Sequence, residues 1–109
     1  MKSIEDALLY DFYGNLLTDK MQRALESYLM EDLSLAEIAE AENISRQGVY
    51  DTIRRAIKTL HDYETKLGLA NKFNQQASSL DQALKLIDDK KYDDAKALLT
   101  DLRDEILGE

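Results

Sequence analysis

The chain has 109 residues, 44% of them hydrophobic, which is enough to bury one core. It contains no cysteine, which excludes disulfides and thiolate chemistry, and no proline, which suits uninterrupted helices. The formal net charge is −8, so any nucleic-acid contact must come from a locally basic surface. No apolar run approaches bilayer length, and the N-terminus lacks a basic stretch followed by an apolar one. We therefore expect a soluble cytoplasmic protein with no membrane-inserted segment.

Two helices are expected before residue 33. Ser3 and Asp6 resemble a capping box and open a helix to about Leu17. Its apolar stripe should comprise Ile4, Leu8, Phe12, Leu16 and Leu17. Thr18 then caps a second helix to about Glu31, with a stripe of Met21, Leu25, Tyr28 and Leu29.

Residues 34–55 have the pattern of a helix-turn-helix. Ser34 and Glu37 form a capping box for a helix over 35–42. Asn43 stands at the sharp turn, where Asn tolerates the left-handed conformation, and Ile44 can plug the turn from below. Ser45 caps the second helix. The spacing would present that second helix as a rod able to enter a DNA major groove.

The second helix of the motif is expected to run to Gly68. Its apolar residues form a heptad-like seam of Val49, Ile53, Ala56, Leu60, Tyr63 and Leu67. This seam is longer than a helix-turn-helix needs to close its own core. It favours a homodimer, and the alternative is a monomer in which the first two helices and the tail cover the seam.

A helix-turn-helix domain is expected over 1–68 and a helical hairpin extension over 69–109. Residues 69–79 have weak periodicity and are the predicted hinge, and Ser79 begins another capping-box pattern. The turn is expected at 88–91, before a final helix. The hairpin is locally similar to one tetratricopeptide unit, but no second repeat exists. A hairpin packing on this or a partner subunit is the simpler interpretation. No strand pattern is evident, so the chain is predicted to be all-α.

The candidate site residues lie on the outward face of the second motif helix, where residues 45–58 carry four basic side chains and one acidic one. They are Gln47, Tyr50, Asp51, Arg54 and Lys58, with Arg46 and Arg55 on the flanks. Gln47 can pair with adenine, and Arg46 or Arg54 with guanine. Tyr50 could stack on a base or contact a phosphate, while Arg55 and Lys58 suit phosphates. The alternatives are a protein contact and an ordinary solvated helix face.

Two residues of this helix are unusual. Asp51 could accept from a cytosine amine, but repulsion of phosphate or pairing with Arg54 or Arg55 is the simpler expectation. Gly48 costs about 1 kcal/mol relative to Ala inside a helix. A closely packed neighbouring helix would explain it, and so would a phosphate.

The sequence predicts no enzyme, metal site or cofactor. His61 is the only histidine, and Glu64 shares its helical face, but a zinc site needs further ligands. Asp88, Asp89, Asp93 and Asp94 lack the spacing of a calcium loop, and the four glycines are scattered.

Two families resemble this chain. Residues 28–40, 43–49 and 54–58 are similar to the −35-reading region of bacterial sigma factors, a widely shared motif. Residues 9–21, 28–39 and 44–51 resemble the YlxM-type helix-turn-helix family more specifically. That resemblance implies a small cytoplasmic homodimer encoded beside signal recognition particle components, acting as an accessory or regulator of that pathway. The predicted function is regulatory binding of DNA, or alternatively RNA. The second candidate is an accessory factor that docks on the pathway's GTPase or RNA complex without reading DNA.

Overall fold

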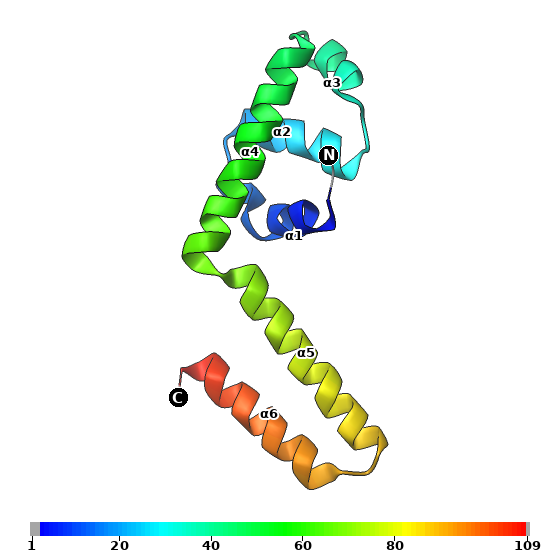
Figure 1. Cartoon of the computed structure of the whole chain (residues 1–109), viewed down its shortest axis with the longest axis vertical. Coiled ribbons are helices and arrows are strands. Elements are labelled where there is room, and N and C mark those ends of the chain that lie inside the picture. The colour runs from blue at the N-terminus through cyan, green and yellow to red at the C-terminus, as the bar shows by residue number, and fades with distance from the viewer. Residues whose placement is uncertain (1–2, 109) are drawn as a thin grey trace. The chain divides into compact units, whose positions relative to one another are not determined.

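The computed structural model describes residues 3–108, and all regular structure in that range is helical (Figure 1). This confirms the predicted all-α class. The elements in chain order are α1 (Ile4–Tyr13), the 3-10 helix η1 (Gly14–Leu16), α2 (Asp19–Leu25), the π-helix η2 (Glu26–Met30), α3 (Leu35–Glu42), α4 (Arg46–Leu67), α5 (Leu69–Asp88) and α6 (Tyr92–Leu107). The chain divides into two compact units, residues 1–70 and 71–109.

Four of the predicted helix caps are present. The side chains of Ser3, Thr18 and Ser45 each accept a hydrogen bond from the backbone N–H three residues later. Ser34 does the same for Glu37, whose carboxylate accepts from the Ser34 N–H in return, so the capping box is complete. These bonds satisfy N–H groups that have no partner inside their own helix.

The core of the first unit forms around α4, which packs against α1, α2 and α3. Figure 1 shows these three helices at successive levels along α4. The largest fully buried side chains are Leu9, Tyr13, Leu25, Ile38, Val49 and Leu60. They come from all four helices, so one core fixes the position of the helix-turn-helix.

The predicted stripe of the first helix was wrong in part. Ile4 is 91% exposed and Leu16 is 57% exposed, whereas Leu9, Tyr13 and Leu17 are buried. The α-helix ends at Tyr13 and continues as η1, so the even helical period does not extend to Leu17. The face that α1 turns toward α4 decides which apolar residues are covered.

The second helix also differs from expectation. It is α-helical only to Leu25 and then becomes the π-helix η2, in which the Glu31 N–H bonds the Glu26 carbonyl. Leu25 is fully buried as expected, and Ala24 is buried beside it, while Met21, Tyr28 and Leu29 are partly buried.

Most of the predicted α4 seam lies in the core of the first unit. Val49, Ile53, Ala56 and Leu60 are all at most 5% exposed, and Gly68 ends the helix with φ of 63°. Leu67 is 53% exposed. Because α1, α2 and α3 already cover this seam, it gives no reason to invoke a second subunit.

The helical structure is not interrupted at 69–79 as expected, because α5 is one continuous helix across this range; the boundary between the two compact units, after residue 70, lies within it. The Ser79 hydroxyl donates to the Gln75 carbonyl inside this helix, so Ser79 does not cap a new one. The range 69–88 contains no Gly or Pro to interrupt it. The turn before α6 is confirmed, with Lys90 in the left-handed conformation at φ of 61°.

The second unit is a two-helix hairpin with few buried side chains. Within it, Ala83, Ala95 and Leu102 are buried, and large apolar residues remain exposed on both helices. Across the described part of the chain, none of the helices has the length and apolar character needed to cross a bilayer.

Candidate nucleic-acid interface

The turn between α3 and α4 sets the direction of the candidate recognition helix. Asn43 adopts the predicted left-handed conformation, with φ of 55° and ψ of 46°. The Ile44 N–H then bonds the Ala39 carbonyl, and Ser45 caps α4 through the Gly48 N–H. A left-handed residue at the helix end reverses the chain within few residues, so α4 begins immediately after α3.

The predicted site residues lie on the side of α4 away from the core. Val49 and Ile53 are buried, whereas the candidate residues between them and after them reach solvent. Arg46, Gln47, Tyr50, Arg54, Arg55 and Lys58 are exposed, and Asp51 is half-buried. Helical periodicity thus brings the seven residues to the accessible surface of one helix, and their role in binding stays a prediction.

Asp51 is paired differently from the expectation. The Gln47 amide Nε2 donates to its Oδ1 at 3.0 Å, one helical turn earlier. Arg54 instead lines a pocket with Tyr28 and Ile57. Within residues 3–108, no ion pair joins Asp51 to Arg54 or Arg55, so that predicted pairing was wrong.

The basic side chains of α4 are not equally available. Lys58 Nζ lies 3.0 Å from Asp62 Oδ2, so its charge is already partly neutralised. Arg46, Arg54 and Arg55 make no ion pair with any residue in the described range 3–108. These three guanidinium groups are therefore the strongest candidates for phosphate or base contacts.

A concave surface adjoins Arg54. The cavity is about 240 Å³ and is lined by Tyr28, Leu35, Tyr50, Ile53, Arg54 and Ile57. Tyr28 and Leu35 were not among the predicted site residues, and they come from η2 and α3. In the sequence, these two residues could have been found only from their positions in the apolar patterns of the second and third helices. Together the six residues offer aromatic and aliphatic contact beside a cation.

Gly48 has a local explanation. A Cβ at this position would lie 3.2 Å from the Ser45 Oγ and 3.9 Å from the Ile44 Cδ1. Among the described residues, no neighbouring helix approaches it that closely, so the expectation of close helix packing was wrong. Glycine instead leaves room for the hydroxyl that caps α4, because the Gly48 N–H is the group that this hydroxyl binds.

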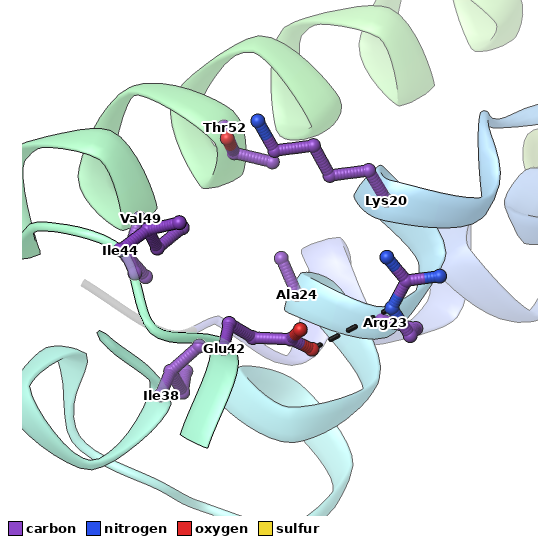
Figure 2. A pocket seen from close by; sticks show the side chains of 8 residues that line it. All are labelled: Lys20, Arg23, Ala24, Ile38, Glu42, Ile44, Val49 and Thr52. Atoms are coloured by element: carbon purple, nitrogen blue, oxygen red, sulfur yellow. Dashed lines mark ion pairs between the residues drawn. The ribbon is translucent and has the colours of Figure 1, made fainter. Parts of the chain in front are cut away.

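A second cavity lies beneath the turn of the motif, where α2, α3 and α4 meet (Figure 2). Its volume is about 150 Å³, and Ala24, Ile38, Ile44 and Val49 supply the apolar lining. Figure 2 shows Lys20 and Thr52 on one side and the Arg23–Glu42 ion pair on the other. That pair joins α2 to α3 at 3.5 Å but is exposed, so it adds little stability. Ile44 lines this cavity but remains 39% exposed, so it fills the turn only in part.

His61 and Glu64 do not act together. His61 Nε2 lies 2.8 Å from Oδ1 of Asp6, a carboxyl group in α1 that is 8% exposed. In the described residues, no group of three His, Cys, Asp or Glu side chains is arranged to hold a metal ion.

Glu64 belongs to a separate network at the end of α4. The Tyr13 hydroxyl donates to Glu64 Oε1 at 2.6 Å and accepts from the Leu69 N–H at 3.0 Å. The same Glu64 oxygen accepts from the Ala70 N–H at 3.1 Å. Burial, and then the hydrogen bond to Glu64, raises the pKa of Tyr13. This network satisfies the first N–H groups of α5 and ties α1 to the α4–α5 junction.

The helical fold agrees with the family and the relatives that this chain matches. Its residues 1–103 match the model of the UPF0122 family, described as "Putative helix-turn-helix protein, YlxM / p13 like". The UPF0122 protein of Desulforamulus reducens is 53% identical over 81 residues, which cover 74% of this chain and 69% of the relative. The UPF0122 protein of Symbiobacterium thermophilum is 41% identical over 106 residues, covering 96% and 99%. The chain belongs to the UPF0122 family of helix-turn-helix proteins.

Proposed function

We propose that this protein is a regulatory factor that binds nucleic acid through the exposed face of α4. The observation that carries the proposal is the set of three arginines, Arg46, Arg54 and Arg55, without ion-pair partners in residues 3–108. They lie on the second helix of a helix-turn-helix, the element that enters the major groove in DNA-binding proteins of this kind. UPF0122 is also not described as an enzyme family.

The charge distribution supports a local contact. Residues 45–58 carry four basic side chains and one acidic one, whereas the whole chain has a net charge of −8. At physiological salt the Debye length is about 8 Å, so distant acidic groups are largely screened from a phosphate at α4. The basic face can therefore bind a phosphate backbone while the acidic body limits affinity elsewhere.

We also propose a homodimer, formed by the hairpin. Leu80, Leu84 and Ile87 share one face of α5 and are 41–60% exposed. On α6, Tyr92, Leu99 and Ile106 recur every seven residues and are 38–60% exposed. Two such hairpins could cover each other's apolar faces, and a twofold axis would offer two α4 helices to paired half-sites.

The place of this activity in the cell is inferred from the resemblance to the YlxM-type family. We propose that the protein acts in the signal recognition particle pathway, with duplex DNA as the first nucleic acid to test and RNA as the second. The second candidate function is an accessory factor that docks on the pathway's GTPase or RNA complex without reading DNA. The exposed apolar faces of the hairpin favour it, because surfaces of this kind serve protein contacts.

The test removes two of these three arginines. Arg54→Ala with Arg55→Ala should weaken binding to duplex DNA and reduce the slope of log affinity against log salt by about 2. The matched control is Lys85→Ala with Lys96→Ala, which makes the same charge change on exposed residues of the hairpin. Helicity by circular dichroism should be unchanged in both. Equal affinity of the Arg54/Arg55 variant and the control at low salt would contradict nucleic-acid binding through α4.

A pull-down from native lysate separates the two candidate functions. Binding through nucleic acid predicts that partners are lost after nuclease treatment. A protein accessory factor keeps its protein partner under the same treatment, and Arg54→Ala with Arg55→Ala then leaves the partner in place.

A further inference from the structure

Gln47 and Asp51 act as one unit on the outward face of α4. They stand four residues apart, so they lie one helical turn from each other. The Gln47 Nε2 donates to Asp51 Oδ1 at 3.0 Å, and the bond is exposed to solvent. The pair is located at the N-terminal part of α4, the part of a recognition helix that reaches base edges.

This hydrogen bond changes what the two side chains can offer to a base. A glutamine reads adenine with its carbonyl and its amide together. In the pair, one amide proton of Gln47 is already engaged by the Asp51 carboxylate. What remains on Gln47 is its second amide proton and its carbonyl oxygen, whereas Asp51 offers only acceptors, its remaining carboxylate lone pairs.

Only some base edges can satisfy the acceptors of the Asp51 carboxylate. In the major groove the donors are the exocyclic amines of cytosine and adenine, whereas guanine and thymine present acceptors there. Adenine places an acceptor nitrogen beside its amine, which a carboxylate repels. Cytosine presents its amine alone, and a carboxylate accepts from it. Asp51 also makes no ion pair with Arg54 or Arg55 in residues 3–108.

We propose that the Gln47–Asp51 pair reads the exocyclic amine of a cytosine, so that Asp51 determines specificity. The proposal rests on nucleic-acid binding through α4 and names the base that this face prefers. A carboxylate near the backbone repels phosphate at every site, and only a site with the amine compensates. Asp51 therefore lowers the affinity for random duplex DNA and increases the preference for a site that carries the cytosine amine.

Selection from a randomised duplex library tests this. The parent chain should enrich cytosine at one position of the bound site. Asp51→Asn should lose that preference and move toward adenine, because an asparagine pairs with the adenine edge through two hydrogen bonds. It should also bind random duplex more tightly. The control Asp81→Asn, with the same charge change on an exposed residue of α5, should keep the preference for cytosine.

A base analogue gives the second readout. At the selected position, cytosine is replaced by the pyrimidinone that lacks the exocyclic amine. The parent chain should lose about tenfold in affinity, the size of a good base contact, while Asp51→Asn should respond by less than about twofold. A parent chain that ignores the analogue, or a cytosine preference that survives Asp51→Asn, overturns the inference while leaving DNA binding intact. If the parent chain binds no duplex at all, the proposed function fails and this inference fails with it.

Discussion

The two compact units of this protein use their apolar residues in opposite ways. In residues 3–70 large side chains from four helices form a buried core, in which Leu25, Ala56 and Leu60 have no exposed surface. In residues 71–109 the buried residues are Ala83, Ala95 and Leu102, while Leu84, Tyr92 and Ile106 are each more than half exposed. The first unit can thus be stable by its own packing. The second has helices of regular length but leaves its large apolar groups available for another surface.

This contrast separates the residues that stabilise the fold from those that are available for interaction. Burying a Leu or Phe side chain contributes about 1.5–3 kcal/mol relative to leaving it exposed. The first unit gains this stabilisation from buried side chains at several positions on four helices. A two-helix hairpin cannot do so, because a single hairpin buries too little area to offset its conformational entropy. The same argument indicates that the hairpin packs against a partner surface, whereas the first unit needs no partner to bury its core.

The largest expected effect comes from opening a cavity in the first unit. Leu60→Ala should lower the free energy of unfolding by about 2–5 kcal/mol, because Leu60 is fully buried against neighbouring helices. Urea unfolding followed by circular dichroism measures the change. Leu107→Ala is the matched control in the hairpin, where the side chain is 62% exposed and lies outside the proposed dimer face. An equal loss of stability in both variants would contradict the contrast between the units.

A smaller effect is expected at the α4–α5 junction. Tyr13→Phe removes the hydroxyl that binds Glu64 and Leu69, and should cost about 1–3 kcal/mol because these groups are partly buried. Tyr63→Phe is a suitable comparison, since its ring packs on Tyr13 with a centroid distance of 5.8 Å. Chemical denaturation at pH 7 measures both variants. No loss in Tyr13→Phe would mean that the network does not stabilise the junction.

The same substitution has a pH signature. Burial, followed by the hydrogen bond to Glu64, raises the pKa of Tyr13 in the folded chain. Above about pH 10 the unfolded phenol ionises first, so the unfolded state binds fewer protons and stability falls as pH rises. Tyr13→Phe should reduce this alkaline loss. It should not abolish it, because burial also raises the pKa of Tyr10. An unchanged alkaline profile would argue against the raised pKa of Tyr13.

The smallest effect on folding, with a clear effect on assembly, is expected in the hairpin. Leu84→Glu should change the stability of the first unit by less than about 0.5 kcal/mol, because the residue is exposed and lies in the other unit. It should also lower the mass measured by light scattering from a dimer to a monomer. Gln82→Glu makes the same charge change at an exposed polar position of α5. A monomeric parent chain would contradict the proposed homodimer.

Removing the hairpin tests the same contrast between the units. A shortened chain ending at Phe73 should be a monomer if the hairpin forms the interface. Dimers that persist in this shortened chain would place the interface on the first four helices. They would also remove the proposed role of the hairpin.

Many local features of this protein could be predicted from its sequence. The caps at Ser3, Thr18, Ser34 and Ser45, the left-handed Asn43 and the buried period of α4 depend on residues within one or two turns of each other. Their spacing is therefore visible in the sequence. The exposed position of Arg54 and Arg55 follows from the same period. The hinge at 69–79 was predicted from weak apolar periodicity. A segment that contains no Gly or Pro can nevertheless remain helical where its apolar periodicity is weak.

Contacts between distant parts of the chain were set by the tertiary structure alone. Asp6 pairs with His61, and Tyr13 with Glu64, over separations of 55 and 51 residues. No spacing rule connects such pairs, because they depend on how α1 docks against α4. The same docking selected Leu9 and Tyr13 over Ile4 as the buried face of α1. The structure also makes Gln47 the partner of Asp51, whereas Arg54 lines a cavity with Tyr28 and Leu35.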